Sequence, residues 1–388
     1  MLTIHIEIWT DESQIAQLCY DYWRLDDEQE AFDIGIADLA ATCGIAHGKI
    51  PSTVQSSCTA SLLDLECSSC GASYVLQSRS DFLALVKSPL PLWTCSVCKQ
   101  QALEKAASAK QQREESTREL IASNIAAIRD EGAQFEQLSF TDAIYLLSVV
   151  RAGGSEDLSH ISPLGEYPLA LTPSLDWDKE ILTRLEKHQL IHVHPDSPPG
   201  TILPGDDEHS WRYYPTMVSY VVPSPNRGPS TPRFVEALSA VLAGGNWPVL
   251  WRADARLLHR RLAIEEVLEF LRCELAAYDM ALHPGEKTML VVRELLSHYS
   301  IGQSFCFIWR AARDAAAYRE KNGISRQQAA NGIPGSIQRS IERAIANGWT
   351  ISHFRRHRDA QETALAQILF TKVLKLANGG LETIPPAD

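Results

Sequence analysis

Four cysteines are the residues whose type and spacing point most directly to chemistry. Cys67 and Cys70 form one C-x-x-C pair, and Cys95 and Cys98 form a second pair after 24 intervening residues. Each pair is a short turn that presents two thiolates, so the two pairs together supply four ligands for a tetrahedral zinc ion. Because protein sulfur would fill all four positions, we expect one structural Zn²⁺ and no catalytic metal at this place.

Residues 61–102 resemble the zinc-ribbon class of small metal modules. The resemblance rests on the two C-x-x-C pairs, on Gly71 directly after the first pair, and on the strand-like stretch Ser73–Leu76. Zinc ribbons occur in proteins of many functions, so the resemblance implies a metal-stabilised module without implying an activity. The alternative interpretation is that these cysteines are core thiols or a redox pair.

A basic stretch near the C-terminus is the best candidate for contact with nucleic acid. Residues 324–343 have the rhythm of two short helices joined by a turn, and arginine pairs well with guanine or phosphate. The alternative is an amphipathic helix pair within a helical bundle, with a polar face that is basic. The candidate nucleic-acid-binding residues, including a following phosphate clamp, are Gln338, Arg339, Arg343, Arg355, Arg356 and Arg358.

Arg293 and His298 match the R-x4-H pattern, which resembles the catalytic motif of HEPN-type ribonucleases. In that family, Arg and His from two chains flank a scissile phosphate, with His as acid or base and Arg stabilising the developing charge. On a regular helix, however, two residues at this spacing point well apart. The alternative is a surface arginine and a histidine that interacts with a helix C-terminus.

His192 and His194 could form a second metal site, because residues two apart on a strand face the same way. Asp196, Asp207 and His209 lie nearby in the sequence. The simpler interpretation is a strand whose exposed face carries polar side chains.

Charge is distributed unevenly along the chain, whose net charge is −12. Residues 1–66 contain twelve acidic and two basic residues, a net charge of −10, whereas residues 305–360 contain ten basic and four acidic residues, a net charge of +6. We therefore expect any nucleic acid to bind through residues 305–360, and any protein partner to dock on the acidic residues 1–66.

The elements that position these residues are predicted to be mainly α-helical and divided among several domains, as a length of 388 residues suggests. Gln100–Ile128 should form an exposed helix, compatible also with a short coiled-coil dimer and hence a homo-oligomer. The strand-like runs Leu190–His194 and Trp211–Tyr214 around a polar loop suggest a wing. The predicted parts are a helical, helix-turn-helix-like module at 1–60, a zinc ribbon at 61–102, a linking helix at 103–134, a winged helix at 135–222, a linker at 223–232 and a helical domain at 233–388.

These patterns favour a zinc-containing nucleic-acid-binding or regulatory protein, of a type found in bacterial mobile elements or phage defence. A protein-interaction scaffold and a HEPN-type ribonuclease are the alternatives. The sequence contains none of the motifs G-x-x-x-x-G-K-S/T, G-x-G-x-x-G after a strand, G-x-S-x-G or H-E-x-x-H, so we favour a non-enzymatic role. The acidic N-terminus and the short apolar runs predict a cytoplasmic protein without a signal peptide or membrane span.

Overall fold

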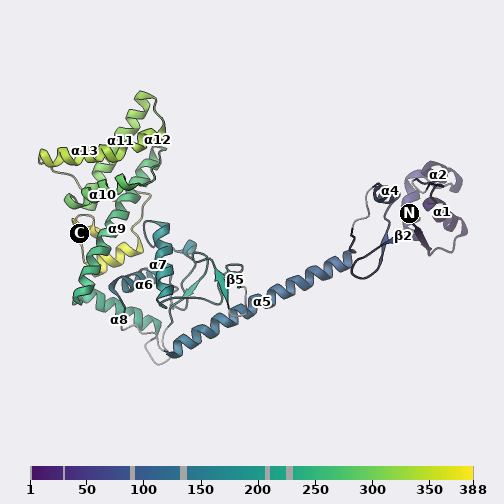
Figure 1. Ribbon diagram of the computed structural model, residues 1–388, viewed down its shortest axis with the longest axis horizontal. Helices are drawn as coiled ribbons and strands as arrows, with labels where there is room; N and C mark the ends of the chain where they lie inside the picture. The colour runs from purple at the N-terminus through teal and green to yellow at the C-terminus, as the bar shows by residue number, and fades with distance from the viewer. Residues whose placement is uncertain are drawn as a thin grey trace. The chain divides into compact units, whose positions relative to one another are not determined.

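The computed structural model describes residues 2–28, 31–87, 92–131, 138–205, 210–223 and 230–387. The chain divides into two compact units, unit 1 (Met1–Gln112) and unit 2 (Arg113–Asp388). The structure is mainly helical with small antiparallel sheets, as the sequence predicts (Figure 1). None of the described helices is both long enough and apolar enough to cross a bilayer.

A three-stranded antiparallel sheet in the order β1-β2-β3 supports unit 1. Its strands are β1 (Ile4–Ile8), β2 (Cys58–Glu66) and β3 (Ser73–Val75). Our expectation that residues 1–60 contain only short helices is therefore wrong at both ends. The alternation of apolar and polar residues in Ile4–Ile8 is the pattern of a half-buried strand, and β1 pairs with β2 so that Ile6 lies opposite Ala60.

The helices of unit 1 pack on the sheet through a shared core that includes Leu39, Ile50, Val54 and Leu62. Glycine and proline mark two of the helix boundaries. Gly44 ends the second helix at φ 66°, which favours glycine, and Pro51 lies in the first turn of the third. The helices are α1 (Ser13–Trp23), α2 (Ile36–Cys43), the 3₁₀ turn η1 (His47–Lys49), α3 (Ile50–Ser57) and α4 (Arg79–Val86).

The long helix predicted after the cysteine pairs is α5 (Ser96–Glu131), which begins within the second C-x-x-C pair. Its side chains between residues 99 and 113 are exposed. Further along, Ile121 and Ile125 are buried against Val221. The second half of α5 is therefore part of the packing of unit 2, and not only a connection.

One hydrophobic core extends through unit 2, from Phe140 to Leu381. It contains residues from both sides of the predicted linker at 223–232, of which residues 224–229 lie outside the described part of the chain. Helix α11 packs along α9, and α13 packs on α10 and α11 (Figure 1). The helical elements are α6 (Phe140–Gly153), η3 (Leu164–Glu166), α7 (Leu175–Lys187), α8 (Thr231–Gly244), α9 (Val249–Ala277), α10 (Glu286–His298), α11 (Ile301–Asn322), α12 (Arg326–Asn331), α13 (Ile333–Ala346), α14 (Ala364–Ala366), its π-helical continuation η4 (Gln367–Val373), and η5 (Ala377–Gly380).

The strands of unit 2 pair differently from the predicted wing. β4 (His192–Val193) pairs with β7 (Tyr220–Val221), whereas β6 (Trp211–Tyr213) pairs with β5 (Ile202–Pro204). We expected the run around His192 to pair with the run around Trp211, which is wrong. A short strand within the intervening loop, Ile202–Pro204, pairs with the Trp211 run in place of the His192 run.

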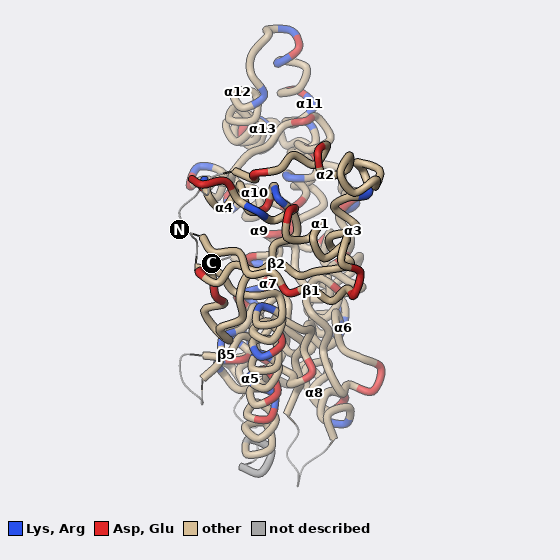
Figure 2. The backbone as a smooth tube through the Cα atoms, turned by 90° about the vertical axis from the view of Figure 1, so that its right-hand side faces the viewer, with Lys and Arg blue, Asp and Glu red and all other residues tan. Residues whose placement is uncertain are grey.

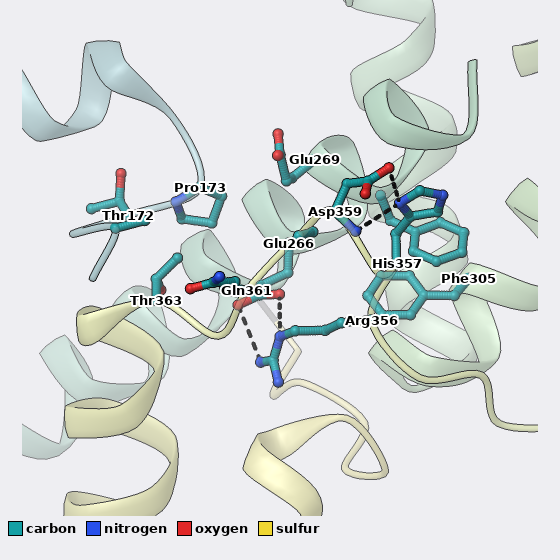
Figure 3. A pocket seen from close by; sticks show the side chains of 13 residues that line it. Thr172, Pro173, Glu266, Glu269, Phe305, Arg356, His357, Asp359, Gln361 and Thr363 are labelled. Atoms are coloured by element: carbon teal, nitrogen blue, oxygen red, sulfur yellow. Dashed lines mark hydrogen bonds and ion pairs between the residues drawn. The ribbon is translucent and has the colours of Figure 1, made fainter. Parts of the chain in front are cut away.

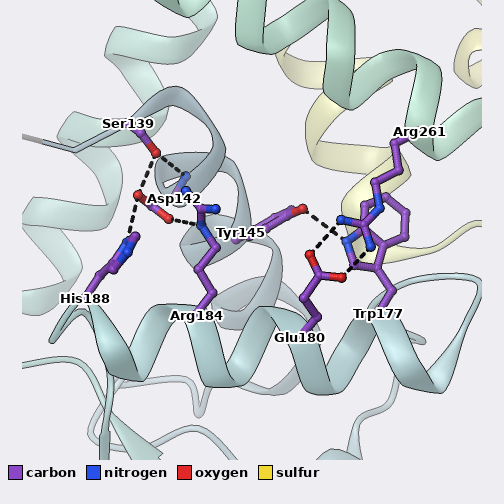
Figure 4. Close-up of polar contacts among 8 residues, drawn as sticks. All are labelled: Ser139, Asp142, Tyr145, Trp177, Glu180, Arg184, His188 and Arg261. Carbon is purple, nitrogen blue, oxygen red and sulfur yellow. Dashed lines mark hydrogen bonds and ion pairs between the residues drawn. The ribbon is translucent and has the colours of Figure 1, made fainter.

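A partly buried polar cluster joins α7 to α6, and an exposed ion pair joins α7 to α9 (Figure 4). Asp142 of α6 is 5% exposed and accepts hydrogen bonds from Arg184 Nε at 2.6 Å and from Ser139 Oγ at 2.6 Å. Burial raises the pKa of Asp142, but the hydrogen bonds from Arg184 and Ser139 outweigh burial and lower the pKa below its ordinary value. Glu180 on the outer side of α7 forms a two-point ion pair with Arg261 of α9.

Candidate metal centre and basic surface

The four predicted metal ligands converge in unit 1. The sulfur atoms of Cys67, Cys70, Cys95 and Cys98 all lie within 4.8 Å of one another, and Cys70 Sγ is 3.8 Å from Cys95 Sγ. Four sulfurs arranged tetrahedrally at about 2.3 Å from a zinc ion lie about 3.8 Å apart, so the spacing suits such a site. The cluster is therefore close enough to bind one metal ion.

Local turns deliver each cysteine pair to the cluster. After β2, the Cys67 amide donates to Ala72 O at 2.8 Å and the Gly71 amide donates to Cys67 O at 2.9 Å, which closes a tight turn. Gly71 has φ 71°, a conformation that favours glycine. The sequence expectation of a sharp turn after the first pair is thereby met.

Contacts outside the sulfurs hold the two turns together. The Ser68 amide donates to Trp93 O at 2.9 Å, and Ser68 Oγ lies 3.1 Å from Thr94 Oγ1. The rings of Tyr74 and Trp93 contact edge to face at 5.0 Å between centroids. These contacts connect β3 and the first turn to the segment that enters α5, so the cluster lies at the junction of three elements.

Backbone amides also donate to sulfur, as in metal-binding turns. Cys95 N donates to Cys67 Sγ at 3.3 Å, and Cys98 N donates to Cys95 Sγ at 3.3 Å. The Cys95 amide lowers the pKa of Cys67 to about 6, whereas hydrogen bonds that the Cys98 thiol donates to the sulfur of Cys70, and then to that of Cys95, raise the pKa of Cys98 to about 12. The amides therefore favour a thiolate at the most buried sulfur of the cluster.

No other metal-like group of three or more His, Cys, Asp or Glu side chains is found among the described residues. His192 Nε2 lies 3.2 Å from Gln189 O, and His194 Nδ1 accepts from the Asp196 amide at 3.1 Å, so these groups serve local backbone contacts. Asp207 and His209, which we considered with them, lie outside the described residues.

The remaining cysteines fit the expectation of packed thiols. Cys19, Cys58, Cys273 and Cys306 are buried, and Cys43 is half-buried. Burial raises the pKa of Cys19 to about 12, so this thiol stays protonated.

Two of the predicted nucleic-acid-binding residues lie on one exposed face of α13. Arg339 and Arg343 are exposed and one helical turn apart, while Ile337 and Ile341 on the opposite face are buried. Gln338 is half-buried. Among the described residues, neither arginine has an ion-pair partner. Figure 2 shows blue segments for basic residues on α12 and α13.

Sequence reasoning missed Lys287, which comes from α10 and meets the same face. A Cβ atom built on Gly335, in the first turn of α13, would lie 3.5 Å from Arg339 Nη1 and 3.7 Å from Lys287 Nζ. Lys287 too is exposed and has no ion-pair partner in the described part of the chain. Two cations thus converge over the positive end of a helix dipole, an arrangement that favours an anion. The only sequence signal was Pro334-Gly335, a helix start without a side chain at its third position.

The predicted phosphate clamp separates in the structure. Arg355 and Arg358 are exposed, but Arg356 points inward and pairs with the buried Glu266, with Nε 3.0 Å from Glu266 Oε2 (Figure 3). Arg356 Nη1 also lies 3.8 Å from Glu362 Oε1. Its guanidinium is therefore engaged inside the protein, and we leave it out of the basic surface. We define the basic surface as Lys287, Arg339 and Arg343.

Arg293 and His298 are both exposed on α10, and His298 contacts the Tyr299 ring edge to face. Residues five apart on a regular helix differ by about 140° in direction, so the two side chains of one chain do not converge. No further acid, base or cation joins them in the contacts of the described residues.

A scan against protein-family models and searches of curated proteins and of solved structures found no match to this chain.

Proposed function

We propose that this chain is a zinc-containing protein that binds nucleic acid through the basic surface of unit 2. In this proposal a zinc-ribbon-like module at residues 61–102 holds one structural Zn²⁺ on Cys67, Cys70, Cys95 and Cys98. The convergence of Lys287 and Arg339 over the first turn of α13 is the single observation that carries the nucleic-acid part.

The donor set supports zinc over other metals. Four cysteine sulfurs are soft ligands, and zinc is the common structural metal of such a set, whereas magnesium and calcium prefer oxygen. With every position filled by sulfur, the metal would stabilise the fold and leave no place for a substrate.

The basic surface supports a polyanionic partner. The cations at Lys287, Arg339 and Arg343 are unpaired within the described residues, so their charge is available to phosphates. A helix N-terminus beside two cations suits one phosphate, and Arg343, one helical turn further on, suits the next. Recognition would thus begin with the nucleic-acid backbone.

The test is a fluorescence-anisotropy titration of the full chain with labelled duplex DNA, single-stranded DNA and RNA at several salt concentrations. We expect a Kd that rises steeply with salt, and Arg339→Glu with Arg343→Glu should weaken binding by about tenfold or more. The matched control is Arg256→Glu, which makes the same charge change at an exposed position of α9. Binding that is insensitive to salt, or equal losses in both variants, would remove the proposal.

The same titration tests the alternatives drawn from the sequence. Binding that is absent for all three nucleic acids, together with a protein that co-purifies with the acidic residues 1–66, would favour the scaffold interpretation. RNA that is cleaved without added metal, and left intact by His298→Ala, would favour the ribonuclease interpretation. Intact RNA after long incubation would exclude it.

A further inference from the structure

One cavity of unit 2 shares no lining residue with the basic surface. Its volume is about 400 Å³, which is within the range of small-molecule sites. Its walls come from the start of α7, from η3 and the chain that follows it, and from the loop before β7. Most of the lining is apolar, from Leu164, Leu171, Leu175 and Met217, and the polar side chains of Tyr167, Asp178 and Thr216 also line it.

Asp178 has an oxygen that no protein group satisfies. The side chain is 8% exposed, and Oδ1 has no hydrogen-bond partner among the described residues. Burial raises the pKa of Asp178 to about 6, although hydrogen bonds with Thr172 act to lower it. A carboxylate that is buried without a cation costs stability, so such groups are usually paired or serve a site.

Tyr167, which also lines this cavity, has a second unsatisfied polar atom. Its hydroxyl is buried and has no hydrogen-bond partner in the described part of the chain. The ring lies directly over Gly153 of α6, where an added Cβ would come within 2.1 Å of it. Burial, and then the nearby charge of Asp178, raise the pKa of the phenol, so it stays a neutral donor and acceptor.

Unit 2 also has the pocket shown in Figure 3, but no charged group there lacks a partner. The charged side chains of this pocket already have partners, because Glu266 pairs with Arg356, Glu269 pairs with Arg272, and His357 lies 3.5 Å from Asp359. A ligand there would have to replace existing ion pairs. At the cavity beside Asp178 the carboxylate has no cation partner among the described residues, so a cationic ligand could bind there without replacing an ion pair.

We propose that this cavity binds a small aliphatic amine in its ammonium form. The ammonium group donates to Asp178 Oδ1 in a charge-assisted hydrogen bond, and a second N–H donates to the Tyr167 hydroxyl. The alkyl group then packs against the leucines and Met217, which removes apolar surface from water. A neutral ligand of the same shape leaves the carboxylate unpaired, so charge decides the specificity.

The probe is 3-methylbutan-1-amine, and its comparator is 3-methylbutan-1-ol, which has the same shape and no charge. Each is titrated into the full chain at pH 7.5, with binding followed by calorimetry and by the ¹³C-methyl NMR signal of Met217. We expect a saturable shift with the amine and a Kd for the alcohol that is about tenfold higher or more.

Asp178→Asn keeps the shape of the side chain and removes its charge, and should raise the Kd of the amine by about tenfold or more. Tyr167→Phe removes the second contact and should raise the Kd by about threefold. The control Asp176→Asn removes an exposed charge from the same turn of α7 and should leave the Kd within about twofold. No saturable shift, equal affinity for amine and alcohol, or unchanged binding by Asp178→Asn would overturn the proposal.

Discussion

All four residues of the cysteine cluster of unit 1 were predicted from residue types, whereas only Arg339 and Arg343 of the basic surface of unit 2 were predicted in this way. All four cysteines converge, whereas the six predicted nucleic-acid-binding residues separate and Arg356 turns inward to Glu266. A tetrahedral site needs all of its ligands, so the spacing of two C-x-x-C turns specifies one geometry. A run of arginines specifies no geometry, because each can find an acidic partner far away in sequence.

The two regions should also differ in what stabilises them. In unit 1 the described residues from β2 to α5 include few large buried side chains besides Leu62, Leu65, Leu76 and Phe82, so we expect the metal to contribute much of the order of this segment. Unit 2 has an extensive apolar core of its own. Substitutions in the cysteine cluster should therefore change the stability of unit 1, and substitutions of buried charges should change the stability of unit 2.

The largest effect is expected from Cys98→Ser. Loss of one ligand should release the metal and destabilise unit 1 by on the order of 5 kcal/mol, since binding free energy is folding free energy in small metal modules. Elemental analysis and hydrogen exchange measured separately for each unit check this. The control Cys43→Ser changes another half-buried cysteine of unit 1 outside the cluster. Faster hydrogen exchange in unit 2 as well would contradict the expectation that the metal stabilises unit 1 alone.

The next effect is expected from Arg356→Ala, which leaves Glu266 buried without its cation. Glu266 is 6% exposed, and removal of one partner of a buried ion pair costs about 3–5 kcal/mol. Denaturant unfolding of unit 2 measures the loss, with metal content unchanged. Arg355→Ala, at the exposed neighbouring position, should cost less than about 0.5 kcal/mol. Equal costs for the two variants would show that Arg356 does not act from inside.

A smaller change in stability, this time an increase, is expected from Asp178→Asn. Burial raises the pKa of Asp178 in the folded protein to about 6 from its ordinary value of 3.8, so the charged carboxylate destabilises the folded protein at high pH. The variant should be more stable than the wild type by at most about 3 kcal/mol at pH 8. The gain should shrink as the pH falls through 6 and vanish below pH 4. Unfolding curves across this range test it, and a gain that is constant with pH would contradict it.

The smallest effect on stability is expected on the basic surface. Arg339→Ala with Arg343→Ala should change the unfolding free energy by less than about 0.5 kcal/mol, because both side chains are exposed and unpaired within the described residues. The same variant should reduce the salt slope of nucleic-acid binding by about two, one for each lost phosphate contact. A marked loss of stability would place these arginines among the structural ion pairs.

Local signals predicted local structure well. The sequence predicts a helical domain at 233–388, and helices α8 to α13 lie within it. In the structure, the side chains of Ser300 and Ser325 accept amide hydrogen bonds at the starts of α11 and α12. The turn at Gly71 and the convergence of the cysteines also follow from short-range pattern.

Long-range pairing could not be predicted in the same way. The partner of β1 lies more than fifty residues away in β2, and β4 pairs with β7 across an intervening hairpin. Two-residue strands carry too little pattern to select a partner. For the same reason, nothing around Arg356 in the sequence indicates Glu266, and nothing around Asp178 indicates Tyr167.

The most direct test of the account is X-ray absorption at the zinc edge on the purified full chain, alongside metal stoichiometry. We expect one zinc ion per chain with four sulfur neighbours at about 2.3 Å. A folded protein without metal, or a metal bound mainly by nitrogen and oxygen, would contradict the central claim that Cys67, Cys70, Cys95 and Cys98 form a structural zinc site.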